Sequence, residues 1–168
     1  MNLERFGSLP DESRLWINGF EQPLGQDERE RVRGRLEPFC STWLSHNDGV
    51  TAAFDIWFDR FVVTAAWTTG GISGCSADGL VRNFKQLRDE GVDGLNGGLI
   101  FYRGGSGEIV SVDHLAFEDI LGGGSIGPDT RVFDTLIQNL GSLREGRFEV
   151  PFSESWHSRR FRLAEPAN

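Results

Sequence analysis

Residues 50–67 read Val-Thr-Ala-Ala-Phe-Asp-Ile-Trp-Phe-Asp-Arg-Phe-Val-Val-Thr-Ala-Ala-Trp, and this stretch decides the fold. Two runs within it, residues 50–58 and 61–67, show the alternation of side chains that is typical of β-strands. Asp59-Arg60 lies between the runs and predicts the tight turn of a β-hairpin. Because both faces of both runs carry apolar residues, we expect the pair to lie centrally in a sheet.

The segments on either side of this hairpin show alternating strand and helix patterns. A strand at 13–20 and a helix at 27–45 precede it, and a helix at 76–90 and a strand at 99–102 follow it. Pro38 predicts a kink in the first helix, or two short helices, because proline removes a backbone hydrogen bond. The order β-α-β-β-α-β predicts an α+β fold with a ferredoxin-like core, in which a mainly antiparallel sheet has helices on one face.

The remainder of the chain is interpreted as C-terminal additions to this core. The patterns there predict strands at 108–112 and 147–151, and helices at 114–121 and from Pro128-Asp129 onward. The length of 168 residues is near that of one domain, so we expect a single domain over residues 1–168.

The composition excludes several classes of protein. Hydrophobic residues make up 38% of the chain and aromatic residues 11%, which excludes general disorder. The net charge of −8 disfavours a nucleic-acid partner, because phosphate contacts need a basic surface. No apolar run approaches the roughly 18 residues of a transmembrane helix, and the N-terminus lacks a signal-peptide pattern. We therefore expect a cytoplasmic protein without a membrane partner.

The segment Ser73-Gly74-Cys75-Ser76-Ala77-Asp78 is the main candidate for a functional site. It opens a helix pattern, and the free N–H groups at a helix N-terminus stabilise a thiolate or a bound anion. On this interpretation Cys75 is the nucleophile, while Ser73, Gly74, Ser76 and Asp78 shape a ligand-binding loop. The alternative is structural: a serine caps the helix and Cys75 packs as a small apolar residue. The other cysteine, Cys40, lies in an apolar helical stretch and is expected in the core.

Three histidines are candidate partners for the thiol. His46 is expected to cap the end of the first helix, and His114 to be a surface residue. His157 is the better catalytic candidate, because it lies in the polar segment Ser155-Trp156-His157-Ser158-Arg159. The spacings of zinc and calcium motifs are absent from the sequence, so we expect neither a metal site nor a cofactor.

The chain resembles a family of uncharacterised bacterial proteins of about this length. The resemblance rests mainly on the Ser-Gly-Cys-Ser-x-Asp motif at 73–78 and on the Ser-Trp-His-x-Arg motif at 155–159. It implies that the C-terminal motif folds beside the Cys75 loop, so that Trp156 and Arg159 help to bind an anionic group and His157 tunes the thiol. Members have sometimes carried an ABC-transporter ATPase label, which does not fit this chain. It has no Gly-Lys-Ser/Thr motif, and its single lysine is Lys85.

Two classes of function remain open. The first is a module that binds a small anionic ligand or a protein partner around the Cys75 loop; it predicts an inert, buried Cys75. The second is a small thiol-dependent enzyme or redox protein; it predicts an accessible, reactive Cys75 with His157 or His46 close by. A homodimer is also plausible, because an edge strand at 13–20 or 108–112 needs protection.

Overall fold

The computed structural model describes residues 1–95 and 97–163, which divide into two compact units. Unit 1 comprises residues 1–97 and 135–145, and unit 2 comprises residues 98–134 together with the chain from residue 146 onward. Both units combine helices with antiparallel sheets, so the predicted α+β class is confirmed. None of the described helices is both long enough and apolar enough to cross a membrane.

The predicted hairpin forms the centre of unit 1. Strands β4 (Thr51–Trp57) and β5 (Phe61–Trp67) are antiparallel, and β1 (Arg14–Gly19) pairs with the other side of β5. The order β1-β5-β4 places β5 in the centre as expected, but β4 at an edge. The turn also differs from the prediction, because Phe58 and Asp59 are the residues in the left-handed conformation, with φ of 55° and 53°.

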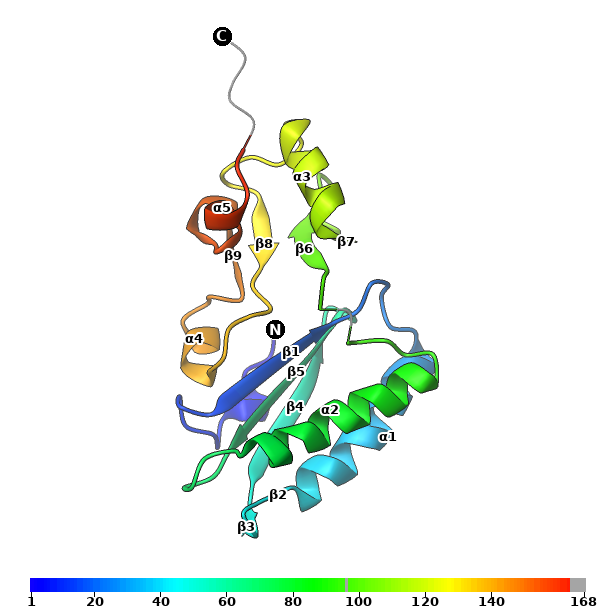
Figure 1. Ribbon diagram of the computed structural model, residues 1–168, viewed down its shortest axis with the longest axis vertical. Helices are drawn as coiled ribbons and strands as arrows, with labels where there is room; N and C mark the ends of the chain where they lie inside the picture. The colour runs from blue at the N-terminus through cyan, green and yellow to red at the C-terminus, as the bar shows by residue number, and fades with distance from the viewer. Residues whose placement is uncertain (96, 164–168) are drawn as a thin grey trace. The chain divides into compact units, whose positions relative to one another are not determined.

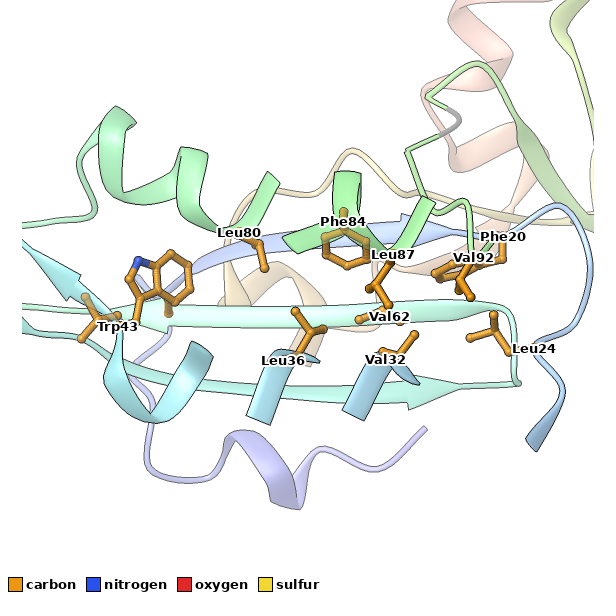
Figure 2. Packing of buried hydrophobic residues seen from close by; sticks show 12 residues of the cluster. Phe20, Leu24, Val32, Leu36, Trp43, Val62, Leu80, Phe84, Leu87 and Val92 are labelled. Carbon is orange, nitrogen blue, oxygen red and sulfur yellow. The ribbon is translucent and has the colours of Figure 1, made fainter. Parts of the chain in front are cut away.

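Two helices cover one face of this sheet (Figure 1). Helix α1 (Gln26–Thr42) packs against β4, and helix α2 (Gly74–Asp89) packs beside α1. Figure 2 shows side chains of both helices meeting Val62 of β5 in one buried cluster. The cluster follows from the sequence, because Leu80, Phe84 and Leu87 recur at the spacing that places them on one side of a helix.

Helix α1 runs through Pro38 as a single segment rather than as two short helices. Proline removes the bond that its own N–H would donate to the carbonyl of Gly34. Downstream, the hydroxyls of Ser41 and Thr42 both donate to the carbonyl oxygen of Pro38, at 2.8 Å each. The helix then ends at Thr42, three residues before the predicted limit.

The ferredoxin-like core is incomplete, which corrects the sequence prediction. The first five elements are present in the expected order, but the sixth, predicted at 99–102, pairs in the sheet of unit 2. The position beside β1 is partly filled by a short segment instead. There Leu15 N–H donates to the carbonyl of Gln138 at 2.9 Å, and Leu140 N–H donates to the carbonyl of Ser13 at 3.0 Å.

The predicted helix from Pro128 onward is also wrong. Residues Arg131–Phe133 form strand β8, and the helix in this region, α4, begins only at Leu140 and ends at Arg144. Val132 and Phe133 are both buried, and β8 has strand partners on both of its sides. Pairing with strands that are distant in the sequence therefore overrides a weak local helix pattern.

Unit 2 contains a four-stranded antiparallel sheet with the order β7-β6-β8-β9. Its remaining elements are β6 (Ile100–Arg103), β7 (Ile109–Val112), α3 (His114–Gly122), β9 (Glu149–Pro151), the 3-10 helix η2 (Phe152–Glu154) and α5 (His157–Arg160). Its buried cluster is built around Phe117 of α3. Across the sheet, Arg103 forms a two-point ion pair with Glu149, at 3.0 and 3.1 Å.

Three short elements complete unit 1: the 3-10 helix η1 (Glu4–Phe6), and strands β2 (Leu44–Ser45) and β3 (Asp48–Gly49). Phe6 packs edge-on against Trp57 of β4, with ring centroids 6.3 Å apart. The guanidinium of Arg144 fastens α4 to this region, because it donates to the carbonyl oxygens of Phe6 and Leu9 at 2.9 Å each.

The core cluster of unit 1 predicts the effect of truncating Leu36. This side chain is fully buried between α1 and the sheet, so Leu36→Ala should lower the free energy of unfolding by about 2–5 kcal/mol, through lost burial and an unfilled cavity. Urea denaturation measures the change. Arg33→Ala, an exposed position on the same helix, is the control and should change stability by less than about 0.5 kcal/mol.

Candidate functional site

Cys75 is the second residue of α2, and its side chain is exposed. Ser73 caps the helix: its hydroxyl accepts a hydrogen bond from Ser76 N–H at 3.1 Å. The helix begins at Gly74, two residues before the predicted start at residue 76, and the predicted capping by a serine is confirmed. The exposure of Cys75 contradicts the structural alternative, in which it packs in the core, and also the buried Cys75 that was expected of a binding module.

Serine hydroxyls hold this loop in place. The Ser76 hydroxyl accepts from the indole Nε1–H of Trp43 at 2.6 Å and donates to the carbonyl of Leu44 at 2.8 Å. The Ser45 hydroxyl accepts from Ser73 N–H and donates to the carbonyl of Gly71, both at 3.1 Å. The hydroxyls of Ser73 and Ser76, which were expected to bind a ligand, are therefore engaged in hydrogen bonds within the protein.

His46 does not cap α1, which corrects the sequence prediction. The helix ends at Thr42, and His46 lies in the turn between β2 and β3. His46 and Asn47 have positive φ angles of 53° and 68°, a left-handed conformation that is uncommon for residues other than glycine. The turn is joined to α2 through the serine network, and sequence reasoning could not find it because the two segments are nearly thirty residues apart.

This turn and the start of α2 line an open, shallow cleft of about 510 Å³. Its lining residues are Leu44, His46, Asn47, Ser73, Gly74, Cys75 and Ser76. The structure thus brings His46 and Cys75 to the same cleft. Asp78, which was predicted to shape the loop, is exposed in the second turn of α2 and does not line the cleft.

Two backbone donors remain unused at this helix end. Ser76 N–H bonds to Ser73 Oγ, and Ala77 N–H bonds to the carbonyl of Ser73. Among the described residues, Gly74 N–H and Cys75 N–H have no hydrogen-bond acceptor. N–H groups in the first turn point out of the helix end and carry its partial positive charge, so they favour a negative ligand.

The C-terminal candidate residues belong to unit 2. His157 is only 1% exposed, Trp156 stacks on it with ring centroids 4.0 Å apart, and Arg159 is exposed. His114, the first residue of α3, packs edge-on against Phe161. The Cys75 loop lies in unit 1, so the placement of the C-terminal motif beside this loop stays a prediction.

Cys40 is buried, as expected, and burial raises the pKa of its thiol to about 11. It therefore stays a protonated thiol at neutral pH. Within residues 1–95 and 97–163, no group of three or more histidine, cysteine, aspartate and glutamate side chains is arranged to hold a metal ion.

Comparison with known protein families, with curated proteins and with solved structures finds no match to this chain.

The hydrogen bond between Trp43 and Ser76 predicts an energetic coupling between α1 and the Cys75 loop. Ser76→Ala removes one acceptor of the buried indole N–H, so it should cost about 1–2 kcal/mol of unfolding free energy. In a Trp43→Phe background the same substitution should cost clearly less. Urea denaturation of the four proteins measures this coupling, and equal costs in the two backgrounds would show that the hydrogen bond contributes nothing.

Proposed function

We propose that this protein is a binding module for a small anionic ligand, which it holds at the N-terminus of α2 in the Cys75 cleft. The observation that carries the proposal is the pair of unused N–H groups of Gly74 and Cys75 at the mouth of a helix of 16 residues. An anion there accepts two backbone hydrogen bonds and is stabilised by the helix dipole.

The surroundings of these two donors support the same class of ligand. His46 lines the cleft, and an imidazole ring supplies an N–H donor to a bound anion. The neighbouring serine hydroxyls are already engaged, so they hold the two N–H groups in place instead of competing for the ligand. Such a fixed arrangement of donors binds without having to order a loop.

The proposal predicts that removing a single N–H group abolishes anion binding. Gly74→Pro removes this donor at the first helical position, where proline is favoured. The extended conformation of Ser73 suits a residue before proline, and a Cβ at Gly74 meets no atom within 4 Å. Titration with inorganic phosphate, followed by amide NMR shifts, should move the Cys75 and His46 signals in the wild type and leave them unmoved in the variant.

Gln26→Pro is the matched control, because Gln26 is the first residue of α1 and lies outside the cleft. It should leave the phosphate titration unchanged. If phosphate moves the signals equally in Gly74→Pro and the wild type, the helix end is not the binding site.

Thiol chemistry at Cys75 is a second candidate function. It is favoured by the exposure of Cys75 and by the presence of His46 in the same cleft, since an imidazole activates a neighbouring thiol by accepting its proton. The buried His157 belongs to unit 2, and its involvement in this chemistry remains part of the family hypothesis.

This second candidate predicts selective alkylation of one thiol. Iodoacetamide should modify Cys75 in the native protein at rates that are already high well below pH ~8, where an ordinary thiol is mostly protonated. Cys40 should react only after unfolding, because it is buried and its pKa is raised to about 11. Mass spectrometry of the Cys40→Ala and Cys75→Ser variants assigns the signal.

In this assay His46→Gln should shift the onset of Cys75 alkylation to higher pH. An onset near pH ~8.5 in the wild type, unchanged by this substitution, would contradict thiol activation and leave the binding function.

The bacterial family, a cytoplasmic location and a homodimer are part of the same proposal. In the described chain, the outer edge of β1 has no backbone hydrogen bond to another segment beyond Leu15, which supports pairing with a second copy.

A further inference from the structure

In the described chain, the C-terminal segment of unit 2, residues 155–163, forms hydrogen bonds only with itself and with the residues just before it. Every hydrogen bond that it makes among the described residues ends within residues 152–161. Phe161 N–H donates to the carbonyl of His157 at 2.7 Å, and Arg159 N–H donates to the carbonyl of Trp156 at 3.1 Å. The segment is therefore held to the rest of unit 2 by side-chain packing and not by backbone pairing.

That packing is aromatic and includes a buried imidazole. The rings of His157 and Phe161 lie 5.9 and 5.2 Å from the ring of Phe117 on α3, and Trp156 stacks on His157. The exposed His114 at the start of α3 also packs against Phe161, with ring centroids 5.6 Å apart. Of the three rings in the described segment, Trp156, His157 and Phe161, only His157 carries an ionisable group.

The indole of Trp156, stacked on His157, favours a positive charge there, whereas burial and the lack of a described hydrogen-bond partner at Nδ1 oppose one. The Nδ1 atom of His157 and the neighbouring Trp156 Nε1 are buried and have no hydrogen-bond partner among the described residues. The charged and titratable residues on the elements packed against it are Asp113, His114, Glu118 and Asp119 around α3, Glu154 on η2, and Arg159, Arg160 and Arg162 in the segment itself. In the described chain, none of their carboxylates forms an ion pair with His157, whereas His114 opposes its protonation.

We propose that His157 is an acid-sensitive latch, whose protonation releases residues 155–163 from α3 and exposes the aromatic cluster around Phe117. The packed state disfavours the protonated imidazole, because a buried charge without a hydrogen-bonding or carboxylate partner is costly. The released state hydrates the imidazolium and separates it from His114. The latch lies in unit 2 and is independent of the anion site.

The direction of the pH effect follows from linkage. Burial, and secondarily the nearby His114, lower the pKa of His157 from its usual 6.5 to about 4 in the packed state. The released state has the ordinary value and binds the proton more tightly, so acid favours release. The packed state keeps its full advantage above pH 6.5 and loses it progressively as the pH falls toward 4. Between pH 7.5 and 5.0 the released population should rise about 30-fold.

Amide hydrogen exchange of the full chain tests this latch. After correction for intrinsic exchange rates, the protection factors of Phe161 and Arg159 should fall about 30-fold from pH 7.5 to 5.0. The amides of α2 in unit 1 should show no such fall. In His157→Phe, which keeps an aromatic ring without a titrating group, the fall should disappear, whereas His46→Phe should retain it.

An NMR titration of the imidazole in the wild type keeps the test decisive if His157→Phe does not fold. A pKa of His157 well below 6 supports the latch, and a value near 6.5 overturns it. Equal pH dependence of Phe161 protection in the wild type and His157→Phe also overturns it.

Discussion

Strand β5 must be covered on both faces, because every side chain from Phe61 to Ala66 is buried. Val62 and Ala66 belong to the cluster beneath α1 and α2, so the alternate residues face the opposite side of the sheet. On that side Phe61 is the cross-strand partner of Trp57, and η1 brings Phe6 against Trp57. The two helices and the N-terminal segment are therefore needed to cover the two faces of β5. The N-terminal ends of these helices in turn determine where backbone N–H groups are left without a partner inside the helix.

The candidate site is a consequence of how α2 is attached. A helix that packs its apolar side on a sheet exposes its first N–H groups, unless side chains or the preceding loop satisfy them. Here Ser73 satisfies one donor, and the carbonyl of Ser73 satisfies the next. Gly74 and Cys75 keep theirs. The β2–β3 turn, which is fastened to the same loop by Ser45, then adds His46 to the cleft. In unit 2, by contrast, His157 is buried.

Much of this could be predicted from local patterns. The β4–β5 hairpin, the helices α1 and α2 and a capping serine near Cys75 were predictable, because each depends on alternation, helical spacing or capping within a few residues. The position of His46 beside the Cys75 loop could not be predicted. It depends on a left-handed turn at residues 46 and 47, and their residue types do not indicate such a turn. The sixth predicted strand was placed in the wrong sheet, because pairing between strands is a contact at long range. The polar residues at 155–159 gave no sign that His157 is buried.

By itself, the sequence determined the class of fold, the central strand and the helix end that carries Cys75. These depend on the period of apolar side chains and on the few residue types that begin a helix. Only the tertiary structure decided that β6 joins a second sheet, that His46 shares the cleft with Cys75, and that His157 is buried beside Phe117. These three facts are contacts between segments distant in sequence. They depend on which surfaces are left to be buried once the first sheet and its helices have formed.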